Sequence, residues 1–422
     1  MRIVAAHKYY WPKAGAETYL FALERQLALA GHEVVPFAMA HPSNRPTPWD
    51  KYFVSQVEFR GRRDLLGDVG RAARVVYSGE ARAKMAALLD DARPDFAHLH
   101  NIAHQLSPSI LDALAERAVP VVQTVHDYKP LCPVYTFRSL GEVCERCRGG
   151  RYWNVAARRC NAGSLPLSAT NMVEAYVHAW RRSYDRVHVF HCPSLFLFAK
   201  MLEFGVPRER LAFVPHFVDA AAYAPAFGGG RYALFAGRLA EEKGVSTLLA
   251  AHAAVPGLEL VIAGDGPLRA ELEAALTPEQ RGRVRFAGHL TGAAYDEAWA
   301  QAACLVLPST WYEVRPMAIH EAYARGKAVV STRIGSIPEI VEDGVTGRLV
   351  PPGDAAALGE AMRELTADPA RAEAMGRAGR ALVERDYGPA RHVAAILALY
   401  AQAQAISRAG RAARAPRTGR AA

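Results

Sequence analysis

The sequence predicts an α/β protein of two doubly wound domains, each a parallel sheet with helices on both faces. Short apolar runs alternate with helical patterns along the whole chain of 422 residues, which is typical of parallel sheets. The alternation is interrupted once, by Ala-, Pro- and Gly-rich sequence at about 219–230, after which a second series of strands begins. The chain length also favours two or three domains.

The first domain is expected to span residues 1–215. Its predicted strands are 3–6, 32–38, 96–100, 121–125 and 187–192. Its predicted helices follow the small-residue loop 13–17 and cover 69–90 and 167–182. An irregular insertion that carries four cysteines is expected at about 128–166.

A linker, 216–230, leads to the second domain, 231–386. The predicted strands there are 232–236, 258–263, 284–286, 304–307, 328–331 and 347–350, and helices follow over 354–385. A C-terminal helix, 387–405, is expected to cross back to the first domain, and a basic disordered tail is expected over 406–422.

The composition limits where the protein is expected to be found and which classes of partner it is expected to bind. No apolar run approaches the ~18 residues that span a bilayer, and the first residues form a strand pattern rather than an export signal, so we expect a cytoplasmic protein with reduced thiols. The net charge of +9 favours anionic partners. The tail arginines are compatible with peripheral contact with anionic lipid on the inner face of the membrane. Nucleic acid is not expected, because no aromatic residues alternate with those arginines.

Two glutamates follow the 304–307 strand, Glu313 on a loop and Glu321 on the next helix. The helix is predicted to start at Pro316, because the missing proline N–H would be unpaired there anyway. The amides of 317–319 would then form an anion site. A nucleotide sugar, with hydroxyls at both ends and phosphates between them, fits this layout. For the pair alone, solvated surface glutamates are the more common explanation.

Two further loops end strands of the second domain. Gly237, Arg238 and Lys243 lie in the first, where open α/β sheets bind ligands, and an Arg/Lys pair suits a diphosphate. Surface charges beside a turn would explain this loop equally well. The second, 264–267, reads Gly-Asp-Gly-Pro and permits close approach of a ligand or of backbone.

Taken in order, GRLAEEKG, GDGP, PSTWYEVRPMAIHEAYARGKAVV and GSIPEIVEDGVTGRLVPPGD resemble the donor half of retaining glycosyltransferase family 4. The resemblance covers nearly the whole chain. It implies the GT-B fold, in which two Rossmann-like domains face each other across a cleft. It also implies transfer of a sugar from a UDP- or GDP-linked donor, and no catalytic divalent metal is expected.

The resemblance implies roles for individual residues. Arg238 and Lys243 would hold the diphosphate, Glu313 would contact the transferred sugar, and His126, after the 121–125 strand, would hydrogen-bond the sugar or the developing charge. Donor contacts are implied for Gly15, Gly237, Gly264, Asp265, Gly266, His289, Leu290, Pro316, Met317, Ala318, Ile319 and Glu321, the last on the ribose.

The N-terminal half resembles an acceptor domain, and a glycan or polyprenyl-linked sugar is the implied acceptor. The residues implied to face it are His100, Asn101, His104, Gln105, Asp127 and Tyr128. The chain departs from many relatives at 315–316, where it has Arg-Pro, and at 335–336, where it has Gly-Ser. Both departures could alter the choice of sugar.

Four cysteines, Cys132, Cys144, Cys147 and Cys160, fall within the insertion. In a cytosolic chain this spacing indicates four thiolates around one structural metal, most commonly zinc, which would supply folding energy that a polar insertion lacks. Scattered free thiols are the alternative. Cys192 and Cys304 are expected to be packing residues.

Three functions are compatible with the sequence. The leading one is a retaining transferase that acts in surface-polysaccharide assembly. A GT-B nucleotide-sugar 2-epimerase or hydrolase would use the same donor site, and acceptor-dependent release of product separates the two. A non-catalytic scaffold docked through a zinc knot and basic tail is disfavoured, because a decayed enzyme would be expected to lose some of its charged donor-site residues.

Overall fold

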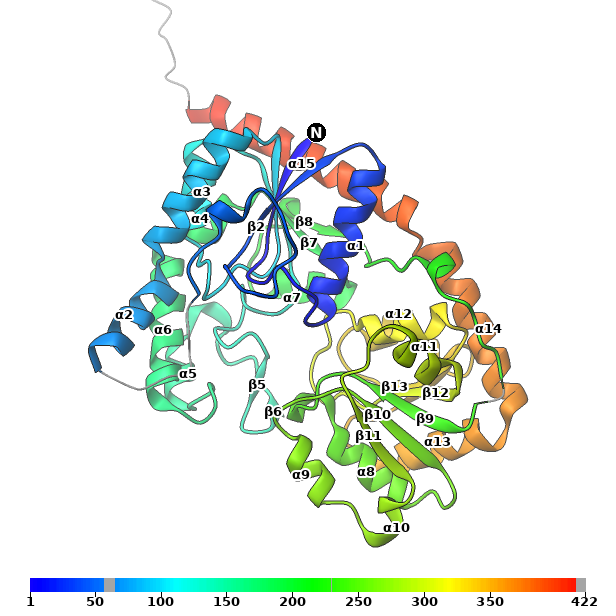
Figure 1. Cartoon of the computed structure of the whole chain (residues 1–422). Coiled ribbons are helices and arrows are strands. Elements are labelled where there is room, and N and C mark those ends of the chain that lie inside the picture. Colours follow the sequence, from blue (N-terminus) through cyan, green and yellow to red (C-terminus); the bar gives the residue numbers. More distant parts are fainter. Residues whose placement is uncertain (57–64, 229, 415–422) are drawn as a thin grey trace, which may run out of the picture.

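The computed structural model describes residues 1–56, 65–228 and 230–414, and within them the chain forms two six-stranded parallel sheets (Figure 1). The first sheet has the order β2-β1-β3-β4-β7-β8. Its strands are β1 (Arg2–Ala6), β2 (Glu33–Phe37), β3 (Phe96–Leu99), β4 (Val121–Thr124), β7 (Val189–Cys192) and β8 (Leu211–Phe213). The predicted fold class is confirmed, although β8 was not predicted.

The second sheet has the order β11-β10-β9-β12-β13-β14. Its strands are β9 (Tyr232–Ala236), β10 (Glu259–Ala263), β11 (Val284–Gly288), β12 (Ala302–Leu307), β13 (Ala328–Thr332) and β14 (Gly347–Val350). Every residue of β9 and β13 is buried, as expected for parallel strands that are covered on both faces. A short antiparallel hairpin, β5 (Arg138–Ser139) and β6 (Glu142–Val143), lies in the cysteine-bearing insertion.

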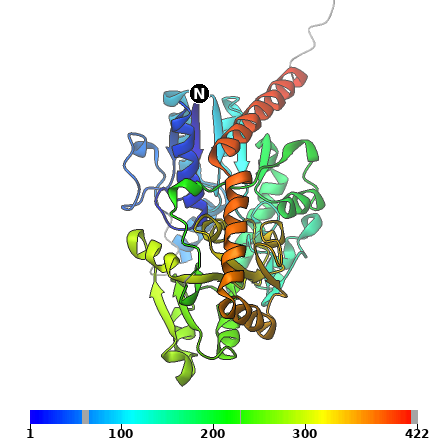
Figure 2. The same cartoon turned by 90° about the vertical axis from the view of Figure 1, so that its right-hand side faces the viewer.

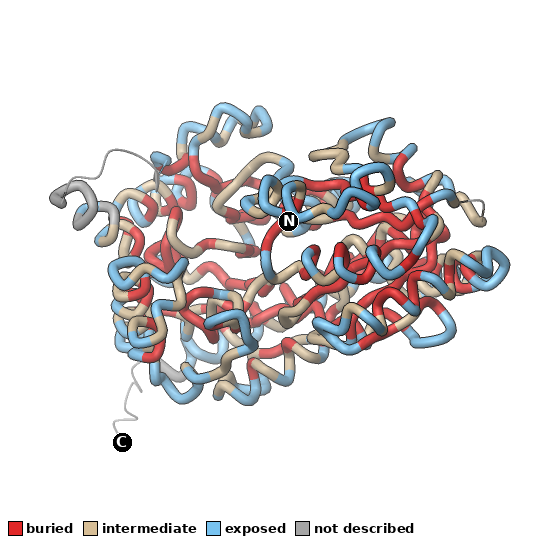
Figure 3. The backbone as a smooth tube through the Cα atoms, turned by 90° about the horizontal axis from the view of Figure 1, so that it is seen from below, coloured by how far each residue is buried: buried red, intermediate tan, exposed pale blue. Residues whose placement is uncertain are grey.

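Helices cover both sheets, and Figure 3 shows buried chain running through the interior of each half. The helices of the first half are α1 (Gly15–Leu29), α2 (Leu65–Val76), α3 (Gly79–Ala92), α4 (Ile110–Glu116), α5 (Trp153–Ala157), α6 (Leu165–Trp180) and α7 (Leu195–Glu203). Those that follow are α8 (Val245–Ala253), α9 (Arg269–Ala274), α10 (Pro278–Arg281), α11 (Gly292–Ala300), α12 (Met317–Ala324), α13 (Ala355–Ala367), α14 (Pro369–Asp386) and α15 (Pro389–Arg414). Short 3₁₀ turns are η1 (Asp50–Tyr52), η2 (Arg148–Gly150), η3 (Ser183–Arg186), η4 (Arg208–Arg210), η5 (Ala220–Ala222), η6 (Glu241–Lys243) and η7 (Ile337–Glu339).

The single helix predicted over 69–90 is wrong, because two helices, α2 and α3, occupy this region. Ser78 separates them: its hydroxyl accepts a hydrogen bond from the Ala81 N–H at 3.1 Å and so caps a new helix start. The apolar periodicity continues across the break, which is why the pattern alone did not reveal it.

The last helix, α15, returns to the first half and packs against α1, β4 and β7 (Figure 2). It continues to Arg414, so the prediction of a disordered tail from residue 406 is wrong for residues 406–414, which are helical. Alanine and arginine are strong helix formers, and a single glycine, Gly410, does not end the helix. The rest of the predicted tail, 415–422, lies outside the described residues.

Loops at the carboxyl ends of the two sheets meet one another. The Glu339 carboxylate accepts hydrogen bonds from the Leu195 and Phe196 amides, at 2.8 and 2.6 Å, at the start of α7. Tyr312 donates to Glu145 at 3.0 Å, which joins the second half to the insertion. Among the helices of the described ranges, we find none with the length and apolar character needed to cross a bilayer.

Candidate active site

The loop after β9 places the Lys243 side chain in contact with Glu313. Gly244 makes this approach possible: it adopts φ +68°, and a Cβ there would lie 2.0 Å from the Pro308 carbonyl oxygen. The Lys243 ammonium donates to Glu313 Oε1 at 2.7 Å, and the Ser309 hydroxyl donates to the same oxygen at 2.5 Å. Two side chains 70 positions apart therefore form one charged centre at the carboxyl edge of the second sheet.

Arg238 lies on the same loop but does not join this centre. Its side chain is largely exposed and pairs with Glu242. To reach a phosphate, the guanidinium would have to leave that carboxylate. Gly237, immediately before it, keeps an ordinary backbone conformation and lies against Phe235.

The start of α12 lies beside the same centre. The helix begins at Met317, one residue later than predicted, and Pro316 is its N-cap, in an extended conformation with ψ 111°. The Ile319 N–H donates to the Pro316 carbonyl at 3.2 Å, so this amide is already used. The predicted anion site thus narrows to the amides of Met317 and Ala318.

The first half contributes a glycine loop to this helix start. A Cβ built on Gly15 would lie 3.6 Å from the Met317 side chain, so the start of α1 and the start of α12 face each other. Ala14 is the N-cap of α1, and the buried Glu17 is the third residue of that helix. The Glu17 carboxylate accepts the Ala14 N–H at 2.9 Å, which fixes the loop. The predicted partners from the two halves are therefore neighbours.

Glu321 lies further along α12 with a partner that the sequence did not indicate. The Tyr295 hydroxyl, from α11, donates to Glu321 Oε2 at 2.7 Å. Burial raises the pKa of Glu321, while the Tyr295 hydrogen bond and the charge of Arg325 oppose that rise. A tyrosine on a different helix has no spacing signal, and only the structure could reveal it.

Gly264 and Gly266 pack against the backbone of the loop that carries Arg238. A Cβ on Gly264 would lie 1.8 Å from the Gly237 oxygen, and one on Gly266 would lie 2.3 Å from the Leu239 oxygen. The Leu239 N–H donates to the Asp265 carbonyl at 2.9 Å, which joins the two loops. The structure thus gives both glycines a packing role.

The other donor-side predictions lie near these loops. The Asp265 side chain is exposed and accepts the Gly266 N–H at 2.7 Å. His289 is exposed after β11, and Leu290 is half-buried against the core of the second half.

A small cavity at the carboxyl edge of the first sheet gathers most of the predicted acceptor side. It is lined by His100, Asn101, His104, His126 and Asp127, among others. Lys8 lines it too and was missed, although its place two residues after the end of β1 is the kind of strand-end position that could have indicated it. Gln105 and Tyr128 are buried and do not line this cavity.

His126 is half-buried and meets His100, with Nε2 and Nδ1 2.9 Å apart. Burial, with smaller contributions from neighbouring histidines, holds the pKa of His126 well below its usual value. The ring is therefore neutral near pH 7 and acts by hydrogen bonding rather than by charge. Tyr128 packs instead between Phe137 and Tyr312, at ring distances of 4.7 and 6.4 Å.

The four insertion cysteines are free thiols that lie close enough to influence one another. Burial raises the pKa of Cys147 to about 12, and Cys132, Cys160 and Cys144 add to that rise. Across residues 1–56, 65–228 and 230–414, no group of three or more His, Cys, Asp or Glu side chains has an arrangement that could hold a metal ion. Cys192 and Cys304 are buried in the two cores, as expected of packing residues.

Two family models match the chain. The family model described as Glycosyltransferase Family 4 matches residues 14–222, and the model described as Glycosyl transferases group 1 matches residues 230–368. The chain is a GT-B glycosyltransferase that uses a nucleotide sugar.

Curated relatives resemble the enzyme over nearly all of its length or over part of it. A glycogen synthase from Mycobacterium tuberculosis is 27% identical over 412 residues, which cover 92% of this chain and 91% of the relative. An alpha-maltose-1-phosphate synthase from the same species is 39% identical over 162 residues, or 35% of this chain and 42% of the relative.

Solved structures share the fold. Sucrose-phosphate synthase from Thermosynechococcus elongatus has a TM-score of 0.68 at 20% identity and covers 96% of this chain and 99% of its own. HepE from Anabaena, in complex with UDP, has a TM-score of 0.68 at 17% identity and covers 95% of this chain and 100% of its own.

Proposed function

We propose that the enzyme is a retaining glycosyltransferase that moves a hexose from a UDP- or GDP-linked donor to a glycan or polyprenyl-linked acceptor in surface-polysaccharide assembly. The observation that carries the proposal is the Lys243–Glu313 contact of 2.7 Å beside the start of α12, with Gly15 of the other half opposite. A cation, a carboxylate and helix amides meet there, where a donor's diphosphate and sugar would lie together.

Glycosyl transfer breaks the bond between the anomeric carbon and the phosphate oxygen. Negative charge then grows on the diphosphate, where Lys243, Arg238 and the α12 amides would stabilise it. Positive charge grows on the sugar, within reach of the Glu313 carboxylate. The acceptor hydroxyl would attack from the face that the phosphate leaves and pass its proton to a phosphate oxygen, which retains the configuration and needs no separate base.

The donor identity draws support from the solved relatives. HepE from Anabaena has been solved with UDP-glucose, which makes a uridine nucleotide the first choice for this enzyme. The half-buried Leu290 and exposed His289, after β11, are proposed to lie beside the base.

Thermal shift against a panel of nucleotide diphosphates and their sugars tests the proposal. A ligand at about 100 times its Kd adds about 2.7 kcal/mol of stability, so a true donor raises the Tm by several degrees. Release of the nucleotide must then depend on an added acceptor. Release at the same rate without acceptor would favour the epimerase or hydrolase, and no shift with any nucleotide would favour the scaffold.

We also propose that Cys132, Cys144, Cys147 and Cys160 hold a structural zinc ion. Their spacing within one insertion supports this proposal, as does the influence of the other three thiols on the pKa of Cys147, which places them near one another. Metal analysis of the purified protein should find about one equivalent of zinc. Less than about half an equivalent of zinc or iron would contradict the site.

The division into an acceptor half, 1–215, and a donor half, 231–386, is part of the same proposal, with α15 returning to the acceptor half. Exposed arginines near the end of α15, Arg408 and Arg411, are proposed to contact anionic lipid on the inner face of the membrane. Flotation with anionic but not zwitterionic vesicles would support that contact.

A further inference from the structure

A second cavity lies between the cysteine-bearing insertion and α6, and none of the roles above involves it. Its volume is about 400 Å³, within the range of small-molecule sites. The residues that matter on its walls are Lys129, Tyr152, Glu174, Arg182, Tyr184 and Asp185. It shares Lys129 and Tyr184 with the smaller cavity that holds His126, so the two cavities are neighbours.

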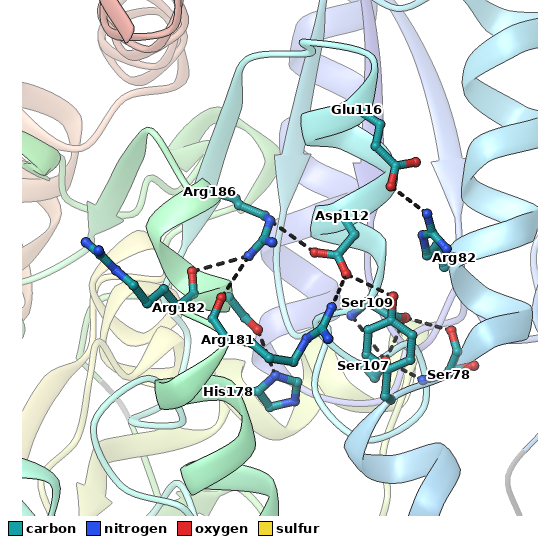
Figure 4. Close-up of polar contacts among 12 residues, drawn as sticks. Ser78, Arg82, Ser107, Ser109, Asp112, Glu116, His178, Arg181, Arg182 and Arg186 are labelled. Atoms are coloured by element: carbon teal, nitrogen blue, oxygen red, sulfur yellow. Dashed lines mark hydrogen bonds and ion pairs between the residues drawn. The ribbon is translucent and has the colours of Figure 1, made fainter. Parts of the chain in front are cut away.

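The α6 wall of this cavity is fixed to the body of the first half. Arg181, at the end of α6, donates to Asp112 Oδ2 at 2.8 Å, and Arg186 lies 3.0 Å from Oδ1 of the same carboxylate (Figure 4). His178 meets the Ser183 hydroxyl at 3.0 Å, which ties α6 to η3. The cavity is therefore preformed rather than created by movement of a loop.

Glu174 is the unusual group on this wall. It is 1% exposed, and its Oε2 accepts the Lys129 ammonium at 2.6 Å, whereas its Oε1 has no hydrogen-bond partner. Burial alone would raise the pKa of Glu174, but Lys129 and His104 outweigh burial and lower it to about 2. An ionised, buried oxygen without a donor is costly, and an O–H or N–H group from a ligand would satisfy it.

The charges around the cavity select a neutral ligand. Lys129 Nζ is already bonded to Glu174 Oε2, to the Pro133 carbonyl at 2.7 Å and to His104 Nε2 at 3.1 Å. Arg182 pairs with Asp185 at 2.6 Å. A phosphate would find both cations engaged and a carboxylate beside it, which disfavours phosphate binding.

A sugar ring fits the remaining groups of the cavity, an acceptor oxygen and two aromatic rings. Its hydroxyls can donate to Glu174 Oε1, and its apolar face can lie on the rings of Tyr152 or Tyr184. Tyr152 is held by an edge contact with Tyr176 at 5.2 Å.

We propose that this cavity is a second acceptor subsite, which binds a neutral saccharide unit of the acceptor away from the reacting hydroxyl. The inference rests on the proposed function, because only a glycan acceptor would extend from the His126 cavity into its neighbour.

The test uses the whole protein, fluorescently labelled, on an array of neutral, phosphorylated and carboxylated oligosaccharides. Wild type should retain neutral oligosaccharides. Ala179→Trp places a large ring in the cavity from an exposed position on α6 and should weaken retention by about tenfold or more. Glu174→Gln removes the charged acceptor and should also weaken retention by about tenfold or more, the scale of a hydrogen bond to a charged group. Val173→Trp, on the same helix but outside the cavity, is the matched control and should not change retention.

Nucleotide binding, measured by thermal shift on the same variants, separates the two proposals. Unchanged nucleotide binding together with lost glycan retention supports the subsite. Equal retention by wild type and Ala179→Trp, retention of phosphorylated or carboxylated oligosaccharides only, or nucleotide binding without any glycan retention would each overturn it. Failure of wild type to bind any nucleotide would refute the proposed function instead.

Discussion

At the scale of single residues, the site depends on contacts that join distant parts of the chain. Glu313 and Glu321 were visible in the sequence as a pair, but their separate environments were not. Glu313 meets Lys243 and Ser309, whereas Glu321 meets Tyr295 from another helix. These environments suit different jobs: the first lies among charges, and the second is held by a hydroxyl at the side of α12.

Glu321→Gln should raise the KM for the donor by about tenfold or more and change kcat little, because ribose contacts are made equally in ground and transition states. Steady-state kinetics with varied donor measure both constants. Tyr295→Phe, which removes only the supporting hydroxyl, should give a smaller rise in KM. A large fall in kcat with unchanged KM would instead assign Glu321 to the chemical step.

Sequence reasoning reached the charged residues of the site but not their partners. Arg238, Lys243 and Glu313 could be predicted because charge beside glycine and proline at strand ends is a recognisable pattern. Tyr295 and the buried Glu174 could not, since their roles depend on which helix packs beside which loop. Tyr128 was predicted to face the acceptor, but burying its aromatic ring in the core is more favourable.

At the scale of elements, loop-to-loop packing positions the donor site. Strands of the second sheet were predicted to within about two residues, because strands buried on both faces are continuous apolar runs. Helix ends were harder. The break at Ser78 and the continuation of α15 to Arg414 depend on one hydroxyl cap and on alanine propensity, which periodicity does not reveal.

Gly264→Ala should destabilise the second half by about 2 kcal/mol or more, because the new methyl group would lie 1.8 Å from the Gly237 oxygen and the loop must move. Urea denaturation measures the loss, and donor affinity should fall with it as the Arg238 loop shifts. Gly79→Ala, at a helix start with nothing within 4 Å, is the matched control and should be nearly neutral. Equal stability of the two variants would contradict the packing role.

At the scale of the whole molecule, buried histidines join the two ends of the chain. His98 bridges Tyr400 of α15 and Thr124 of β4, at 2.8 and 2.7 Å. His392 meets the Tyr19 hydroxyl of α1 at 2.9 Å. The returning helix is thus held by neutral imidazoles, which makes the whole fold sensitive to acid.

Burial lowers the pKa of His7 and His392 to about 3 and that of His191 to about 4, well below the usual 6.5. Such groups stabilise the fold above pH 6.5 and lose that contribution as pH falls towards the folded values. Burial raises the pKa of Glu24 to about 7, so near pH 5 the folded chain holds about one proton more on Glu24 than the unfolded chain does, which partly offsets the histidines. Near pH 5 these four groups alone make the unfolded chain bind a net two protons more, three on the histidines less one on Glu24, so their contribution to stability should fall by about 3 kcal/mol per pH unit.

Urea midpoints at pH 7.5, 6.0 and 5.0 check this prediction. The midpoint should fall steeply below pH 6. The variant His392→Gln, which keeps a neutral hydrogen-bonding group beside Tyr19, should show a shallower fall. A midpoint that stays constant or rises on acidification would show that these histidines are not buried neutral groups in solution.

The central claim is that Lys243 stabilises the charge that develops on the donor diphosphate, and the turnover of Lys243→Ala tests it most directly. With a donor from the nucleotide panel and excess acceptor, kcat should fall by about 10²-fold or more, the scale of removing one preorganised charge stabiliser. Because Glu313 is buried, the loss of Lys243 also lowers stability, so a Tm that stays above the assay temperature separates lost chemistry from a lost fold. Turnover within a few-fold of wild type would contradict the assignment of this site.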